Sequence, residues 1–252
     1  MKTFIYSMLK PLNILLILLT FTALNSCDKS EGVPAAANMD SYYPLAVGKY
    51  ITYRLDSTVY VNFNTKKEVH TYIVQDKIDA IIKDNLGNDA YRIRRMMRSN
   101  TDTTQWFDNA TFLVVPTLQK TEFIENNLRF IKLVNPIKEY TTWQGNNQIN
   151  TVDQLLRFYE NWEYFYESVG TPYTVNNKQF PETITINQID EVDGDPGNKN
   201  FAYTIKKSVE VYAKGVGLVY KDFLHEAWQV TPTSNFQTNS FGIRLTILNH
   251  NF

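Results

Sequence analysis

The sequence predicts an all-β fold, or a β-rich fold with one short helix, in which a large antiparallel sheet curls into a half-open barrel. Apolar and polar residues alternate along many segments, which is the period-two pattern of half-buried strands. Short polar stretches rich in Asn, Gly and Asp separate these segments and suit tight turns. We expect about nine or ten strands. A sheet of this size twists, and curling protects both its core and its edges.

Residues 1–26 have the features of an export signal. The segment carries Lys2 and Lys10 and no acidic residue, and an apolar run covers 12–24. This run is shorter than the roughly 20 residues that a permanent membrane-spanning helix needs. A tilted membrane anchor and the start of a core helix are the alternative interpretations.

The four residues LNSC, 24–27, contain the one cysteine of the chain and resemble the bacterial lipobox. There a diacylglycerol is attached to the cysteine sulfur before cleavage ahead of it. Asn25 departs from the pattern, which prefers a small residue. A thioether needs no second cysteine, so lipidation of Cys27 explains the odd count of one. A free exported thiol is the alternative.

The resemblance implies a protein of the cell envelope that meets the membrane through a lipid anchor on Cys27. Two or more acyl chains hold such an anchor firmly. We expect the outer membrane, with the periplasmic and surface sides both open. Without Lys2 and Lys10, 23 basic residues face 26 acidic ones, a net charge of −3. This balance gives no field that attracts nucleic acid.

The expected domain organisation has three parts. Residues 1–26 are the signal, and 27–41 are the lipidated cysteine with a flexible tether of small and polar residues. Residues 42–252 form a single β-rich domain, because no internal repeat divides them.

The expected strands follow one another along this domain. The first begins at Ile51, which shares a face with Tyr53 and Leu55. A turn is expected in 83–89 and a hairpin turn at Asn126–Asn127, where Asn tolerates positive φ. The later candidate strands are 162–169, 182–189, 202–213, 217–224 and 241–249. The spacing in 151–162 is compatible with one short helix.

Four stretches together resemble a family of secreted lipoproteins of the Bacteroidota type, for which no activity is known. They are YYPLAVGKYITYRLDS (42–57), TTWQGN (141–146), EVYAKGVGLVYKD (210–222) and FGIRLTILNHN (241–251). The resemblance implies a curved, half-open antiparallel sheet similar to periplasmic lipoprotein carriers, and it supplies no catalytic residue. Gly215 and Gly217 predict a bulge or a tight bend where another backbone approaches.

The acidic stretch 190–200 is a candidate metal site. Asp190, Asp193 and Asp195 lie close enough in sequence to gather around calcium, which takes six to eight oxygen ligands. The stretch lacks the EF-hand pattern, and a solvated loop is the alternative. His70, His225 and His250 are too far apart to chelate a metal as a motif, and no cofactor fingerprint is present, so no cofactor is expected.

The aromatic cluster at 162–166 is a candidate ligand site. Alternation sends Trp162, Tyr164 and Tyr166 to one face, where they can stack on a glycan or line an apolar groove. Packing in the core is the alternative. The arginines in 92–98 are expected on an exposed strand face; they are Arg92, Arg94, Arg95 and Arg98.

These observations predict a lipid-anchored envelope lipoprotein that acts as a binding or carrier module without catalysis. An apolar molecule, a glycan or an envelope partner would be bound. One alternative is an envelope hydrolase acting on glycans, which would use Asp222 or Glu226 with a histidine. The other is a structural partner of an outer-membrane assembly, which would carry a flat apolar patch.

Overall fold

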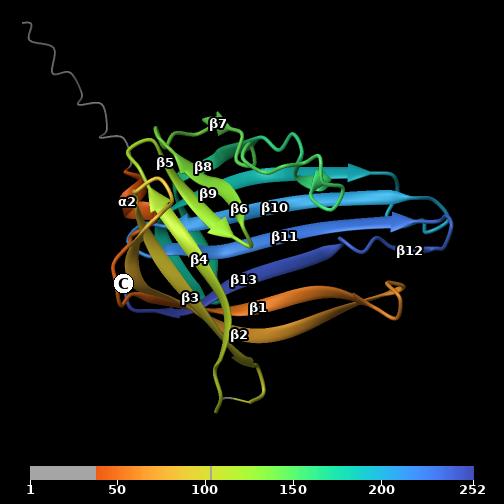
Figure 1. The fold of residues 1–252 in the computed structure, drawn as a ribbon, viewed down its shortest axis with the longest axis horizontal. Coiled ribbons are helices and arrows are strands. Elements are labelled where there is room, and N and C mark those ends of the chain that lie inside the picture. The colour runs from red at the N-terminus through yellow and green to blue at the C-terminus, as the bar shows by residue number, and fades with distance from the viewer. Residues whose placement is uncertain (1–37, 103) are drawn as a thin grey trace, which may run out of the picture. The chain divides into compact units, whose positions relative to one another are not determined.

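The computed structural model describes residues 38–102 and 104–252 (Figure 1). Cys27, the expected signal and most of the expected tether lie outside the described residues. No helix within the described ranges combines the length and apolar character that a membrane span requires.

One antiparallel sheet dominates the fold and confirms the predicted class. Its strand order is β6-β5-β4-β3-β2-β1-β13-β11-β10-β9-β8-β7, with β12 paired to β11. The strands are β1 (Tyr50–Val61), β2 (Lys66–Lys83), β3 (Asp89–Ser99), β4 (Phe107–Pro116), β5 (Lys120–Glu125), β6 (Leu128–Val134), β7 (Thr142–Trp143), β8 (Tyr164–Val175), β9 (Lys178–Asp193), β10 (Tyr203–Ala213), β11 (Gly217–Gln229), β12 (Asn235–Phe236) and β13 (Phe241–His250).

The predicted turns are confirmed. Strands β2 and β3 pair across the Asn- and Gly-containing segment that ends at Asp89. Strands β5 and β6 pair across Asn126 and Asn127, whose φ angles are 50° and 61°. Two consecutive positive φ angles match the right-handed twist of a hairpin, and Asn adopts them at little cost.

The predicted single short helix is present, but it lies outside 151–162. Within 151–162 the structure has only a 3₁₀ turn, η2 (Arg157–Tyr159). Asn150 and Asp153 explain this, because their side chains accept hydrogen bonds from the backbone N–H two residues ahead, which favours turns over a helix. A short helix, α2 (Met39–Tyr42), lies where the tether was expected, with Asn38 as its N-cap. Met39 is buried, so the folded part begins before residue 42.

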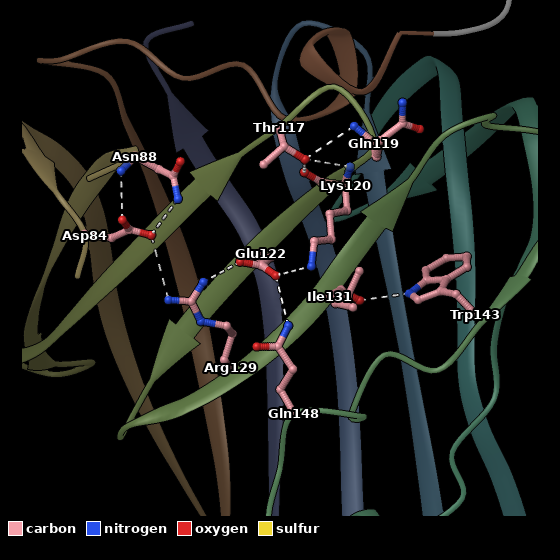
Figure 2. A network of polar contacts seen from close by, with 10 residues as sticks. All are labelled: Asp84, Asn88, Thr117, Gln119, Lys120, Glu122, Arg129, Ile131, Trp143 and Gln148. Carbon is pink, nitrogen blue, oxygen red and sulfur yellow. Dashed lines mark hydrogen bonds and ion pairs between the residues drawn. The ribbon is translucent and has the colours of Figure 1, made fainter. Parts of the chain in front are cut away.

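The two ends of the sheet meet and nearly close the barrel. The backbone N–H of Ile131 in β6 donates to the oxygen of Gly145 at 2.9 Å, just beyond β7. The indole N–H of Trp143 donates to the Ile131 oxygen at 2.8 Å (Figure 2). The Tyr166 hydroxyl bonds both the N–H and the oxygen of Val134. These contacts join residues of β6 to β7 and β8, far apart in the strand order.

A buried carboxylate, Glu122 in β5, reinforces this seam. Its oxygens accept bonds from Lys120 at 2.5 Å, from Gln148 at 2.9 Å and from Arg129 (Figure 2). Arg129 also lies 4.0 Å from Asp84 beside the β2–β3 turn. Burial opposes the charged form of Glu122, but these donors outweigh it and hold the pKa of the carboxyl below its ordinary value.

Candidate functional site

A cavity of about 90 Å³ lies among the strands of the barrel. Segments distant in sequence enclose it: Tyr43 and Pro44 after α2, the β10–β11 turn, and Phe252 at the C-terminus. Its apolar lining includes Ile51, Ile78, Ile93, Phe123, Leu218, Ile243 and Leu245, and its charged lining consists of Lys49, Asp76, Arg95, Glu125, Lys132, Glu210 and Lys221. Such a density of charge inside a barrel is unusual, because an unpaired buried charge is costly.

The β10–β11 turn, which forms one wall of the cavity, contains the two glycines that predict a tight bend. Gly215 and Gly217 have φ angles of 75° and 106°, a region that favours glycine. The N–H of Gly215 donates to the backbone oxygen of Ser41 at 2.6 Å. The predicted bend with another backbone close by is therefore confirmed, and the contact ties α2 to the wall of the cavity.

Arg95 and Asp76 form the first charge pair. The guanidinium Nε and Nη2 atoms each lie 2.6 Å from a carboxylate oxygen, a bidentate geometry. The guanidinium carbon also lies 4.7 Å from the centre of the Phe112 ring. This corrects the expectation of an exposed face for Arg95, since β3 directs it inward with its i−2 neighbour Ile93. Arg92 pairs with Asp79, Arg94 with Asp108, and Arg98 lies over Trp106.

Glu210 is the centre of the second charge group. Its Oε1 atom lies 2.7 Å from the Lys132 ammonium and 3.4 Å from that of Lys221, and its Oε2 atom accepts from the Tyr212 hydroxyl at 2.7 Å. Burial alone would raise the pKa of Glu210. The two ammonium groups and the hydroxyl outweigh burial and lower it to about 2. Lys132 reaches the interior because the β5–β6 register shifts beside it, a bulge that redirects the side chain.

Glu125 and Lys221 are less completely paired. Across residues 38–102 and 104–252, no hydrogen bond or ion pair involves the Glu125 carboxylate, although it lines the cavity. Among the described residues, Lys221 has one polar contact, the 3.4 Å approach to Glu210. Burial disfavours its charged form, but Glu125 and Glu210 outweigh burial and raise the pKa of Lys221. Lys49 instead donates to the Asn251 backbone oxygen at 2.6 Å.

The predicted aromatic residues lie in the core and not on the cavity. Trp162, Tyr164 and Tyr166 are at most 1% exposed, and none of them is part of the cavity lining. Their polar atoms bond the Phe158 oxygen, the Asn146 side chain and the Val134 backbone. They pack with Tyr159 and Phe223 into one aromatic cluster. Their surroundings therefore match the alternative in which these residues pack in the core.

The predicted acidic residues are spread along a strand end and its turn. Asp190 pairs with Lys207 at 3.1 Å, Asp193 ends β9, and the Asp195 carboxylate accepts from the Gly197 N–H at 2.8 Å. In the described part of the chain, no three His, Cys, Asp or Glu side chains are grouped as metal ligands. The geometry therefore gives the calcium interpretation no support.

The residues considered for hydrolysis are bound to other side chains. Glu226 accepts bonds from Tyr60, Lys67 and Tyr203, and Asp222 pairs with Arg244. Every described carboxyl with a shifted pKa is shifted downward. A glycosidase acid needs the opposite shift, so no observation favours the hydrolase.

The three histidines lie on three different strands. His70 lies 3.3 Å from Glu68 on an exposed strand, and His250 ends β13. His225 is buried and stacks on Phe158 with ring centres 4.2 Å apart. Neither of its ring nitrogens completes a hydrogen bond within the described ranges, although Asn239 and the Ile205 backbone lie near. Burial, with the positive charge of Lys206, lowers its pKa to about 4, so it is neutral at pH 7.

The sequence prediction missed the charged residues of the cavity. The available signal was a charged residue at an inward strand position, as in FIKLV for Lys132 and VEVYA for Glu210. Such positions normally hold apolar residues.

The fold and the cavity define the class of this chain as a nearly closed antiparallel barrel with a charged interior. Comparisons with protein-family models, curated proteins and solved structures gave no match. The resemblance to secreted lipoproteins therefore stays a prediction.

Proposed function

We propose that this chain is a lipid-anchored binding protein of the bacterial cell envelope, without a catalytic role, and that its barrel interior holds a small polar ligand. The cavity with charged walls is the observation that carries the binding part of the proposal. The lipobox-like sequence around Cys27 supports the anchor.

The size of the cavity narrows the ligand. A volume of about 90 Å³ is smaller than the roughly 150 Å³ of a cavity that admits one benzene molecule. A fatty acyl chain does not fit, and charged walls disfavour an apolar ligand. A small polar molecule, or the polar end of a larger one, suits both the size and the chemistry better than the apolar cargo expected from the sequence.

A thermal-shift screen tests the binding part. The full lipidated chain in detergent is heated with a panel of small polar metabolites. A ligand present at 100 times its Kd stabilises the folded state by about 2.7 kcal/mol, which corresponds to about 5–10 °C in Tm for a domain of this size. Ile243 lines the cavity. Ile243→Phe places a larger side chain there and is expected to abolish the ligand-induced shift in Tm.

The matched control places the same change on the surface. Ile81 is about half exposed, so Ile81→Phe should leave the ligand-induced shift intact. If no compound in the panel stabilises the wild type, or if both variants keep the shift, the barrel interior is not the binding site.

The anchor has its own test. Cys27→Ala should abolish membrane fractionation or leave an unprocessed precursor, because the sulfur that carries the diacylglycerol is gone. Normal processing and unchanged membrane association of Cys27→Ala would refute the anchor.

A further inference from the structure

Six of the seven charged residues that line the cavity fall into two sets; the seventh, Lys49, donates to the Asn251 backbone oxygen. Asp76 with Arg95, and Glu210 with Lys132, are paired directly at 2.6 to 2.7 Å. Glu125 and Lys221 remain: one carboxylate without a direct partner in the described ranges and one ammonium with a single contact at 3.4 Å. Both line the same cavity, and together they are neutral.

Glu125 and Lys221 are both at least partly buried, unlike an ordinary ion pair on the surface. The Lys221 side chain is 15% exposed, and Glu125 lies partly buried in β5. The two oxygens of Glu210 already face the Lys132 ammonium and the Tyr212 hydroxyl. Lys221 therefore has unused donors, and Glu125 has unused acceptors, beside the same cavity.

We infer that the cavity binds a small zwitterion, whose carboxylate is held by Lys221 and whose ammonium is held by Glu125. This inference rests on the proposed binding function and names the ligand class for the same site. A ligand with both charges pairs with Lys221 and Glu125 at once, whereas an anion or a cation alone would leave one of these two protein charges without a partner. Charge-assisted hydrogen bonds in a shielded site are strong and directional.

The remaining walls limit the rest of the ligand. Ile93, Phe123 and Leu245 border the cavity with apolar surface. A volume of about 90 Å³ leaves room for a hydrogen or a small apolar substituent beside the two charged groups. Glycine, alanine and similarly small amino acids have the required size and charges.

Calorimetric titration of the full lipidated chain in detergent tests this inference through the ligand alone. The probes are glycine and L-alanine, acetate as an anion, and glycine methyl ester as a cation. We expect glycine or L-alanine to bind at least ten-fold more tightly than either singly charged probe. Equal binding of acetate would make the cavity an anion site, and equal binding of the ester would make it a cation site; either result overturns the inference.

Two variants assign the contacts. Glu125→Gln should weaken zwitterion binding at least ten-fold without weakening acetate binding, and Lys221→Gln should weaken it similarly without weakening ester binding. Lys214→Gln is the matched control, because Lys214 pairs with Glu182 on the surface, and it should bind like the wild type. Circular dichroism checks that each variant is folded. Zwitterion binding that survives both interior variants overturns the inference.

The same experiments separate this inference from the proposed function. If an uncharged polar compound binds and Ile243→Phe abolishes its binding, the binding function stands and the zwitterion is wrong. If no probe and no panel compound binds, the cavity holds water only and both proposals fail.

Discussion

Glu122 and Glu210 are two buried glutamates of one sheet with different surroundings. They are 5% and 1% exposed, and cations hold the pKa of each below its ordinary value. Glu122 is saturated by Lys120, Arg129 and Gln148 at the seam where the barrel closes. Glu210 borders a cavity. It lies 3.4 Å from Lys221, whose positive charge is also stabilised by the carboxylate of Glu125.

The difference separates two uses of buried charge. A saturated carboxylate joins strand edges and leaves nothing for a ligand. An interior with one ammonium and one carboxylate short of partners can accept a molecule that completes them. Burial of ion pairs is weak evidence for stability, because desolvation offsets most of the attraction. Stabilisation of the fold alone is therefore a weak explanation of the charged interior, and the proposed binding function supplies another.

The largest expected effect comes from removal of Glu210. Glu210→Met leaves the buried Lys132 ammonium without its closest partner, which costs about 3–5 kcal/mol in the free energy of unfolding. The double variant Glu210→Met/Lys132→Met should recover most of this loss. Urea denaturation measures both. A cost below about 1 kcal/mol for the single variant would show that Lys132 finds other partners or is solvated.

The pH dependence of stability gives the next effect. The pKa of Glu210 falls from an ordinary 4.5 to about 2 in the folded state, so its contribution is complete above pH 4.5 and is lost as the pH falls toward 2. This contribution is on the order of 3 kcal/mol. Urea denaturation at pH 5 and pH 2.5 should show a smaller acid loss in Glu210→Met/Lys132→Met than in the wild type. Equal losses would contradict the assigned pKa.

A smaller effect is expected from Gly145 at the seam. A Cβ atom there would lie 2.3 Å from the ring of the buried Tyr164. Gly145→Ala forces that ring to move and should cost about 1–3 kcal/mol. Gly197→Ala is the control, since its Cβ would meet only the side chain of Asp195. Thermal unfolding compares the two, and equal melting temperatures would show that the seam is not tightly packed.

The smallest effect is expected from the seam hydrogen bond of Trp143. Trp143→Phe removes the bond to the Ile131 oxygen and should cost about 1 kcal/mol. Hydrogen exchange should accelerate for the β6 amides, with Trp106→Phe as the exposed control. Unchanged exchange of the β6 amides would show that the Trp143 hydrogen bond does not hold β6 at the seam.

The sheet could be predicted because its signals are local. Alternation marked strands such as β1 and β13, and Asn126–Asn127 marked a hairpin turn through backbone preference alone. The spacing in 151–162 is compatible with a helix, but only a 3₁₀ turn forms there, because Asn150 and Asp153 bond the backbone locally. The spacing of apolar residues does not report that competition.

The cavity could not be predicted because it depends on non-local features. Its walls combine Tyr43, Lys132, Glu210 and Phe252, which only the closed barrel brings together. Lys132 stands in the apolar run FIKLV, which is a local signal, but the bulge that turns it inward depends on the pairing of β5 with β6. Arg95 shares a face with Ile93, so alternation contained a signal for its inward position, but the neighbouring arginines favoured an exposed face.

Native mass spectrometry of the full chain, purified gently from its own membranes, tests the central claim most directly. We predict that the wild type carries one small polar molecule per chain and that Ile243→Phe carries none, while Ile81→Phe keeps it. A wild-type mass that matches the lipidated chain alone, unchanged after addition of the polar panel, would contradict a ligand site inside this barrel.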